Sequence, residues 1–404
     1  MSRRVALKAG DDLLMDSASS STPSSALVDA DANNTNSIPI EIVSEEEMAF
    51  LEAALSSARH VISALPSVAF PQPRPASSLR RCAASPPPAS DIEDSVGSAP
   101  RESFLRRFRS KRGLTVTDVT ATEWCEKQME YVLLHGKPKR TEAMKAGSDR
   151  HAQLEKEVIE KVEIRIKSVE ESWAIKFMNF IVGTNQLLFE GLTRELPVIG
   201  VFEGIWMVGV IDEIQIPINE ATLNPILVDT KTRRKATLPS EAQKRNARLQ
   251  LMCYKYLWDS LIAEQFPADH FFSYFNLNPQ YILSDVVRQY INSLGFDAKT
   301  FEDVITYFRN TCCLLPPSKE QLLLRYELQS DHSLLEEYYF SYDISWFKSQ
   351  MNETLKIWLG EREAKFVSET EKWKCQFCKF TAICPMTATS RKGEQLGEQA
   401  DRLS

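Results

Sequence analysis

The stretch VGVIDEIQIPINEATLNPILVDTKT (208–232) contains two apolar runs, and an aspartate interrupts each of them. Alternating apolar residues over 207–216 and a short apolar run over 224–232 predict two strands, joined by a turn-rich connection. Asp212 and Asp229 then stand at comparable places on neighbouring strands. Each lies in apolar text that indicates burial, and a buried carboxylate needs a partner, commonly a metal ion.

The second run ends in Asp229-Thr230-Lys231, a triplet of the form D-x-K. Alternate residues of a strand point to the same face, so Asp229 and Lys231 project together. Paired carboxylates can hold one or two hard divalent ions, to which the Thr230 carbonyl can add an oxygen ligand. Lys231 can position a water molecule or stabilise a developing anion. Such a triplet also arises by chance, so the apolar surroundings of the two aspartates are what favour the catalytic interpretation.

Outside this stretch, the hydrophobic period predicts a mixed α/β core. A strand over 195–201 precedes the first run and joins it through a turn at Gly204. The other expected elements are helices over 147–162, 171–189 and 240–265 and a strand over 270–277. Ser240 is the natural N-cap of the third helix. The remainder, to residue 365, is predicted to be mainly helical.

Three further side chains fit a metal-dependent site. His151 lies on a predicted helix upstream of the strands, and an imidazole can ligate a divalent ion, although a surface histidine on a helix is the competing interpretation. Gln250 and Tyr254 are four residues apart and share one helix face. Six basic residues are expected to contact the phosphates along a bound nucleic-acid strand. They are Arg233, Arg234, Lys235, Lys244, Arg245 and Arg248. A solvated basic face is the alternative for these.

The segment WKCQFCKFTAICP (373–385) has three cysteines in the spacing C-x2-C-x5-C-P. Three thiolates make an incomplete site for a tetrahedral metal or an iron–sulfur cluster, so a distant fourth ligand is required. Cys125 is a plausible supplier. The spacing leaves zinc and iron–sulfur comparable, since both accept four thiolates, and ordinary buried thiols are the third interpretation. The expected ligands are Cys125, Cys375, Cys378 and Cys384.

The 404 residues have room for one large domain or two average ones, and their composition is that of an ordinary globular protein. No run approaches 18 apolar residues, so we expect no membrane span. Eight cysteines in a long chain without a recognisable secretory segment favour a reducing compartment over a disulfide framework. The net charge of −7 argues against a surface that is basic all over, although a local basic groove can still bind nucleic acid.

The N-terminal region differs from the rest, because half of the 20 prolines lie in the first 100 residues. Such text cannot bury enough apolar surface to offset its ordering entropy, so we expect residues 1–113 to be largely disordered. Early arginines favour a targeting segment and early aspartates argue against one, which leaves an organelle (chloroplast or mitochondrion) and the nucleus both open. The ordered domain is expected over 114–390 and a disordered tail over 391–404. A single-strand-binding protein is a candidate partner of the N-terminal region.

Four motifs occur in an order that resembles one branch of nucleases. They are G-x3-H (147–151), G-V-I-D (209–212), D-T-K (229–231) and Q-x3-Y (250–254). Together they resemble the RecB-like branch of the PD-(D/E)XK nucleases, and the four cysteines resemble its iron–sulfur members, among them the exonuclease V family. The resemblance covers about residues 115–385. Asp229 is a departure, because the family often has Glu there, a longer arm with the same ligand chemistry.

The resemblance implies a restriction-endonuclease-like PD-(D/E)XK core, closed by a C-terminal iron–sulfur cysteine knot. The implied protein is a monomer that hydrolyses single-stranded DNA from a 5′ end with Mg2+, or Mn2+ as a substitute, in DNA repair or genome maintenance. The implied catalytic set is Lys231, Asp212, Asp229, Gln250 and Tyr254, with His151, Asp212, Asp229 and Thr230 around the divalent ion. The implied ligands of a [4Fe–4S] cluster are Cys125, Cys375, Cys378 and Cys384.

Two other functions stay open from the sequence. One is a non-catalytic nucleic-acid-binding module that keeps the cluster and the fold. The other is a zinc-stapled flap nuclease or endonuclease. The intact Asp212, Asp229 and Lys231 favour an enzyme, because a decayed nuclease usually loses one of them. No Walker A motif (G-x4-G-K-[ST]) occurs, so we expect no helicase motor in this chain.

Overall fold

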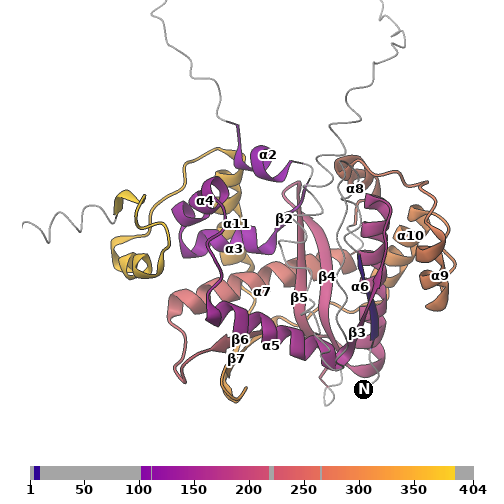
Figure 1. Ribbon diagram of the computed structural model, residues 1–404, viewed down its shortest axis with the longest axis horizontal. Helices are drawn as coiled ribbons and strands as arrows, with labels where there is room; N and C mark the ends of the chain where they lie inside the picture. The colour runs from indigo at the N-terminus through magenta and orange to yellow at the C-terminus, as the bar shows by residue number, and fades with distance from the viewer. Residues whose placement is uncertain (1–3, 10–101, 111, 218–222, 264–265, 387–404) are drawn as a thin grey trace, which may run out of the picture. The chain divides into compact units, whose positions relative to one another are not determined.

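The computed structural model describes residues 4–9, 102–110, 112–217, 223–263 and 266–386 (Figure 1). These residues, Glu102 apart, belong to one compact unit. None of the described helices is long and apolar enough to cross a membrane. The tail expected over 391–404 lies outside the described residues.

A mixed sheet forms the centre of the described unit, which confirms the predicted mixed α/β class. Its six strands are β2 (Leu114–Thr115), β4 (Leu192–Phe202), β5 (Ile205–Gln215), β6 (Ile226–Arg233), β7 (Gln321–Leu328) and β8 (Leu334–Ser341). The order is β2-β5-β6-β7-β8, and β4 pairs with β5. The β2–β5 and β6–β7 pairs are parallel, whereas β4–β5, β5–β6 and β7–β8 are antiparallel.

The alternating sequence predicted the β4–β5 hairpin, which is the longest pairing of the sheet. Its ladder runs from the Leu192–Gln215 pair to the Phe202–Ile205 pair. The turn between the strands uses positive φ at Glu203 and Gly204, a conformation that glycine adopts without strain. A tight turn of this kind sets the register of both strands, and the register places the site described below.

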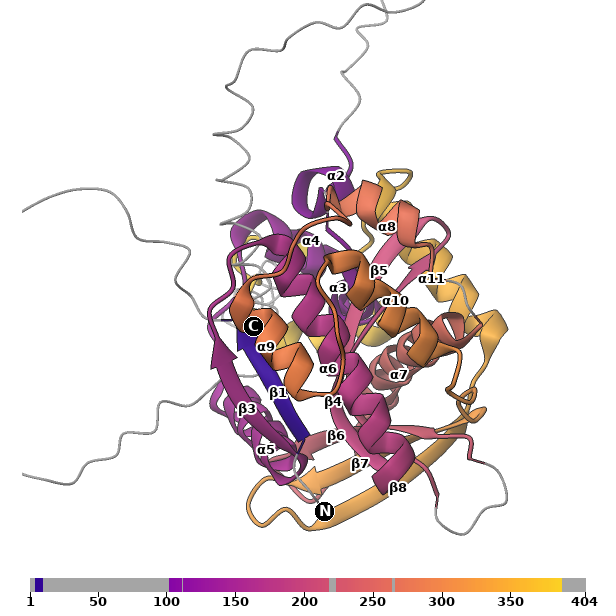
Figure 2. The same ribbon diagram turned by 90° about the vertical axis from the view of Figure 1, so that its right-hand side faces the viewer.

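The helices surround the sheet (Figures 1 and 2). They are α2 (Phe104–Arg109), α3 (Val116–Trp124), α4 (Glu126–His135), α5 (Glu142–Val158), α6 (Val169–Glu190), α7 (Glu241–Ile262), α8 (Ala268–Phe275), α9 (Asp285–Ser293), α10 (Phe301–Cys312) and α11 (Ile344–Leu359). The long α7 packs against four strands, β4 to β7, and α5 packs against β4 and β6. The capping box of Ser240 and Gln243 begins α7 at the predicted N-cap.

The strand predicted over 270–277 is wrong, because this segment forms α8. Its run of aromatic residues has high strand propensity, which favoured an extended segment. In the structure Phe271 and Phe275, four residues apart, are buried together against Trp173 of α6, at ring centroid distances of 5.1 and 5.0 Å. Tertiary packing at helical spacing therefore overrides the propensity, and Asn276 in the left-handed conformation ends the helix.

Three other boundaries differ from the expectation. The helix predicted over 147–162 ends at Val158, and β3 (Ile159–Ile164) follows and pairs in parallel with β1 (Arg4–Ala9), as Figure 2 shows. The segment predicted to be mainly helical to residue 365 contains the strands β7 and β8. The strand β7 begins with a buried apolar run, and periodicity cannot tell such a run from a buried helix. Both β1 and α2 lie within 1–113. The disorder predicted for the rest of that range falls outside the described residues and stays a prediction.

Candidate functional site

The sheet register brings three carboxylates into one row across the strands. The β5–β6 ladder pairs Glu213 with Val228, so the next position along places Asp212 opposite Asp229. In the β4–β5 ladder, Glu195 stands opposite Asp212 in the same way, between the Arg194–Glu213 and Leu196–Ile211 pairs. Directly opposed side chains lie on the same face of a sheet. Glu195, Asp212 and Asp229 therefore line one face of β4, β5 and β6.

Glu195 is the functional candidate that no sequence motif marked. Its backbone has φ +48°, a left-handed conformation that a non-glycine residue adopts only where its surroundings impose it. The hairpin offered a signal, because Glu195 and Asp212 each lie seven residues from the closing pair Phe202–Ile205. Counting outward from the predicted turn would have placed the two acids opposite each other.

The His151 imidazole reaches this row from α5. Its Nδ1 lies 3.6 Å from Asp212 Oδ2 and 4.0 Å from Glu195 Oε1. Its Nε2 is 2.9 Å from the Thr230 carbonyl oxygen, and a carbonyl accepts only, so Nε2 carries the proton and Nδ1 presents its lone pair to the acids. Gly147 lies one turn earlier, where a Cβ would come within 3.3 Å of Thr232 Oγ1. The G-x3-H motif thus lets α5 approach β6 closely.

The donor set fits a hard divalent cation. Single ligand atoms of His151, Glu195 and Asp212 lie within 4.8 Å of one another. Asp212 Oδ2 and Asp229 Oδ2 are buried and have no hydrogen-bond partner among the described residues. A cation would supply the missing partner to these oxygens and would separate the Nδ1 lone pair from the carboxylates. Thr230 offers its carbonyl nearby, already bonded to His151.

The electrostatics of the row differ from residue to residue. Burial, and then the neighbouring Asp229, raises the pKa of Asp212 well above its usual range. Burial would also raise the pKa of Asp229, but the Lys231 ammonium outweighs burial and lowers it. Burial and Lys231 both lower the pKa of His151, which keeps its imidazole neutral and able to ligate. The row thus combines a carboxyl whose ionisation Lys231 favours with one whose ionisation burial and Asp229 oppose.

A hydrogen-bond chain joins the D-x-K triplet to the Q-x3-Y pair on α7. Lys231 Nζ donates to Asp229 Oδ1 at 2.8 Å and to Gln250 Oε1 at 2.9 Å. Gln250 Nε2 in turn donates to the Tyr254 hydroxyl at 3.2 Å. Burial would lower the pKa of Lys231, but Asp229 and Asp212 outweigh burial and raise it. Gln250 and Tyr254 therefore position a permanently charged ammonium beside the acids.

Gly209 of the G-V-I-D motif explains how Tyr254 reaches this chain. A Cβ at residue 209 would lie 2.7 Å from Tyr254 Cε1 and 2.9 Å from Val116 Cγ2, both too close. The Tyr254 ring therefore packs directly on the backbone of β5, three residues before Asp212. Burial, and then the charge of Asp212, raises the pKa of Tyr254 well above its usual range, so the phenol stays protonated.

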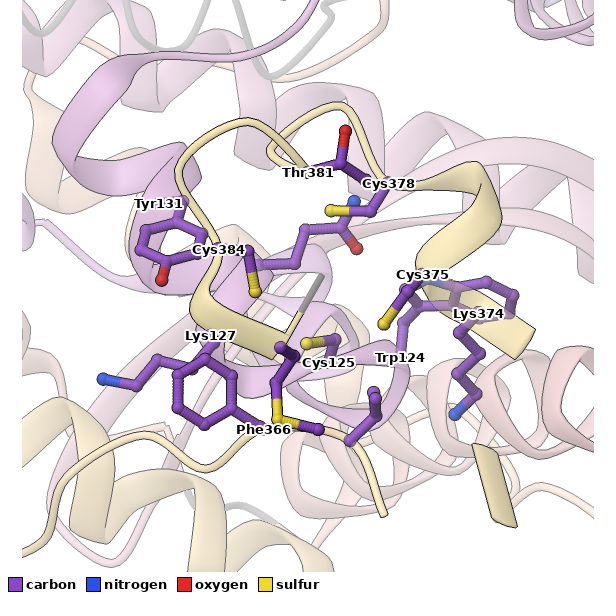
Figure 3. A pocket seen from close by; sticks show the side chains of 13 residues that line it. Trp124, Cys125, Lys127, Tyr131, Phe366, Lys374, Cys375, Cys378, Thr381 and Cys384 are labelled. Atoms are coloured by element: carbon purple, nitrogen blue, oxygen red, sulfur yellow. The ribbon is translucent and has the colours of Figure 1, made fainter. Parts of the chain in front are cut away.

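The four predicted cysteine ligands lie together, although 250 residues of chain separate the first from the second. Figure 3 shows Cys125, Cys375, Cys378 and Cys384 around a single pocket. Cys125 is the extended residue between α3 and α4. Cys375 lies within the 3₁₀ helix η1 (Glu369–Phe377), Cys378 is the C-cap of η1, and Cys384 follows in the next segment. None of these four cysteines forms a disulfide bond. Burial raises the pKa of Cys125, and so do Cys378 and Cys375. Four thiols around one space match the donor set of a four-thiolate metal or cluster site.

Arg245 links the helix that carries Gln250 to the two segments that supply the cysteines. Arg245 of α7 bonds Glu123, two residues before Cys125, and donates to Glu371 of η1 at 2.9 Å. Two other residues expected to contact phosphates also form salt bridges. Lys244 pairs with Glu336, and Arg248 pairs with Glu241. Arg234 and Lys235 are exposed. Among the six predicted basic residues, these two are therefore the most accessible to a phosphate backbone.

Comparison with known proteins adds independent findings. The chain matches a family model described as "Exonuclease V - a 5' deoxyribonuclease" over residues 103–225, 219–313 and 304–385. A zebrafish (Danio rerio) protein named Exonuclease V is 31% identical over 332 residues, which are 79% of this chain and 83% of that protein. The crystal structure of SSO0001 covers 68% of this chain and 86% of its own, at 13% identity and a TM-score of 0.29. A likeness at that TM-score carries no argument here.

Proposed function

Because the chain belongs to the exonuclease V family, we propose that it is a DNA exonuclease that degrades single strands from a 5′ end with Mg2+. The β4–β5–β6 sheet with α5 and α7 would then be a PD-(D/E)XK core, which a [4Fe–4S] cluster closes through the cysteine pocket. The biological role that we propose is DNA repair or genome maintenance.

The observation that carries this proposal is the pair of buried carboxylate oxygens, Asp212 Oδ2 and Asp229 Oδ2, that have no hydrogen-bond partner among the described residues. Asp212 Oδ2 lies 3.6 Å from His151 Nδ1, and Asp229 stands opposite Asp212 in the β5–β6 ladder. We propose His151, Glu195, Asp212 and Asp229 as the ligands, with the Thr230 carbonyl holding the imidazole through its opposite ring nitrogen. A bound Mg2+ would make water a better nucleophile there and would offset charge at the scissile phosphate.

The chain's own residues supply positioning and charge. His151 is oriented by the Thr230 carbonyl, so that Nδ1 points at the acids. Lys231, held by Asp229 and Gln250, places a positive charge where the attacked phosphate gains negative charge. Tyr254 fixes the Gln250 amide, so the ammonium keeps one position during the reaction.

We propose the preference for single strands from one sequence feature and from two exposed basic residues. The sequence contains no Walker A motif, which favours a substrate that needs no unwinding. The exposed Arg234 and Lys235 follow the catalytic strand directly and can contact a phosphate backbone. A non-catalytic binding module is the weaker alternative, since it does not require the Lys231–Gln250–Tyr254 chain.

A four-thiolate cluster at the cysteine pocket would join the segment at Cys125 to η1. Zinc is the alternative occupant, because it accepts the same four ligands. The ultraviolet–visible spectrum and the iron content of protein purified without oxygen distinguish them. Broad visible absorption with iron supports the cluster, and a colourless protein that contains stoichiometric zinc contradicts it.

Digestion of end-labelled DNA tests the function. Single strands labelled at the 5′ or the 3′ end, with and without a blocked end, and a blunt duplex of the same sequence are incubated with Mg2+ or EDTA. We expect early release of the 5′ label from the unblocked single strand, only with Mg2+. Equal rates on the blunt duplex and the single strand would contradict single-strand preference, and early release of the 3′ label would contradict the polarity.

A further inference from the structure

Two buried donors beside the row of acids have no hydrogen-bond partner among the described residues. They are the hydroxyl of Tyr326 on β7 and Nε of Arg233 on β6. Tyr326 is only 3% exposed. A buried donor without an acceptor is destabilising, so such a group in a folded protein usually has a reason outside the stability of the fold.

The sheet register places both donors on the face that carries the catalytic residues. Lys231 and Tyr326 are directly paired in the parallel β6–β7 ladder. Arg233 follows Lys231 by two residues, and so lies on the same face about 6.6 Å further along the strand. Burial, and then the charge of Asp229, raises the pKa of Tyr326, whereas Arg233 acts to lower it. Both residues are therefore close enough to affect the same hydroxyl. Lys231, Tyr326 and Arg233 thus form a short path that leads away from the acids.

The chemistry of this path selects an anion. An arginine Nε–H donates only, and a phenol that stays protonated is a neutral donor, so neither attracts a metal cation. An oxygen of a phosphate accepts from both, and hydrogen bonds to a charged acceptor are the stronger kind. Consecutive phosphates of an extended DNA strand are spaced comparably to alternate residues of a β-strand. A strand whose scissile phosphate lies at Lys231 therefore brings its neighbouring phosphate to Arg233.

On the basis of the proposed function, we propose that the Tyr326 hydroxyl and the Arg233 guanidinium bind the DNA phosphate next to the one that is cleaved. Lys244 of α7 belongs to the same place. It pairs with Glu336 at 3.1 Å, and Glu336 stands opposite Tyr326 in the β7–β8 ladder. Because both donors are buried, the phosphate enters when this ion pair opens, and it replaces the Glu336 carboxylate at Lys244.

A binding experiment with singly modified strands tests this subsite. A fluorescent thymidine single strand is titrated with protein in EDTA, which prevents cleavage, and its anisotropy is followed. A series of strands carries one uncharged methylphosphonate linkage, moved through each position near the 5′ end. The proteins are the wild type, Tyr326→Phe, Arg233→Gln and Glu336→Gln. Tyr338→Phe is the matched control, since it removes a phenol hydroxyl on β8 that already accepts from Arg248.

We expect Tyr326→Phe and Arg233→Gln each to weaken binding of the unmodified strand about tenfold. One methylphosphonate position should weaken wild-type binding by a similar factor and have little further effect on these two variants, because contacts that share a partner are not additive. The slope of log Kd against log salt should fall by about 0.7 for Arg233→Gln and stay unchanged for Tyr326→Phe. Glu336→Gln should bind more tightly, and Tyr338→Phe should bind as the wild type does.

The unfolding temperature separates binding from structure. Tyr326→Phe should be as stable as the wild type or more stable, because the lost hydroxyl has no partner to lose. Wild-type affinity of both Tyr326→Phe and Arg233→Gln, or fully additive losses at every methylphosphonate position, would overturn the subsite. If the coupling appears but the wild type does not cleave DNA with Mg2+, the proposed function is wrong and the subsite stands.

Discussion

The row of acids and the cysteine pocket are built in opposite ways. The row comes from adjacent strands, and a hairpin ladder places Glu195 opposite Asp212. The pocket comes from segments far apart in the chain, an extended residue between two helices and the end of a 3₁₀ helix. Regular backbone hydrogen bonds hold the first site in place without any ligand. If the four thiols hold the proposed cluster, the second site depends on that ligand, so substitutions in the two regions should have different effects.

The largest effect is expected from breaking the cysteine pocket. Cys125→Ser should remove iron, DNA binding and cleavage together, because it opens a loop of about 250 residues whose closure stabilises the fold by about 5 kcal/mol if the cross-link behaves as a disulfide does. Iron content, DNA affinity, cleavage rate and circular dichroism are measured on one preparation. Cys313→Ser, at an exposed cysteine outside the pocket, is the matched control. Full iron and normal activity in Cys125→Ser would show that Cys125 is not a ligand.

Lys231→Ala should act on the catalytic region alone. Removing the ammonium should lower kcat by about a thousandfold, as loss of one group that stabilises transition-state charge does. Iron content should stay at the wild-type level, because Lys231 lies on β6 and bonds Asp229 and Gln250, which do not line the cysteine pocket. Single-turnover rates and iron analysis measure both. A tenfold loss or less would remove Lys231 from the catalytic set.

Gly209→Ala should disturb the Lys231–Gln250–Tyr254 hydrogen-bond chain by a steric clash with Tyr254. The new Cβ would lie 2.7 Å from the Tyr254 ring, and relief of such overpacking costs about 1–3 kcal/mol. The displaced ring should disturb Gln250 and Lys231 and lower kcat by about tenfold, with KM nearly unchanged. Thermal unfolding measures the loss of stability, and steady-state kinetics measures kcat and KM. Wild-type stability and rate together would show that the close approach of Tyr254 to β5 is not required.

The smallest effect concerns Glu213, which follows Asp212 but points to the opposite face. It accepts from Arg194 at 2.7 Å and from Arg325 at 2.9 Å. Burial would raise the pKa of Glu213, but the two arginines outweigh burial and lower it. A lowered carboxyl pKa stabilises the fold above the ordinary pKa of Glu, and this stability is lost as pH falls through the lowered value. The free energy of unfolding of Glu213→Gln should therefore depend less on acid pH, measured by urea titration from neutral to acid pH. An unchanged pH dependence would contradict the assignment.

Local patterns predicted the elements that contain the row of acids. Alternation predicted β4 and β5, the apolar run before Asp229 predicted β6, and the N-cap at Ser240 predicted the start of α7. Each of these signals lies within a few residues of the element it defines. The strand β7 gave no such signal, because Leu322, Leu323 and Leu324 are all buried and a continuous apolar run fits a buried helix equally well.

Most of the missed features depend on contacts between distant segments, whereas Glu195 could have been placed opposite Asp212 by counting from the hairpin turn. Glu195 is significant only because the hairpin register places it opposite Asp212, and its strained φ cannot be seen in the sequence. The helix α8 forms because Phe271 and Phe275 pack on Trp173, nearly 100 residues earlier. The partners of Arg245 on both sides of the cysteine pocket were likewise invisible.

The most direct test of the account is one preparation of Asp212→Ala, analysed for iron and for cleavage of a 5′-labelled single strand with Mg2+. The account predicts a full iron complement, wild-type circular dichroism and no detectable cleavage, because the substitution removes a ligand from the row and leaves the cysteine pocket intact. Cleavage within about tenfold of the wild-type rate would contradict the account, since a lost metal ligand should cost several kcal/mol of transition-state stabilisation.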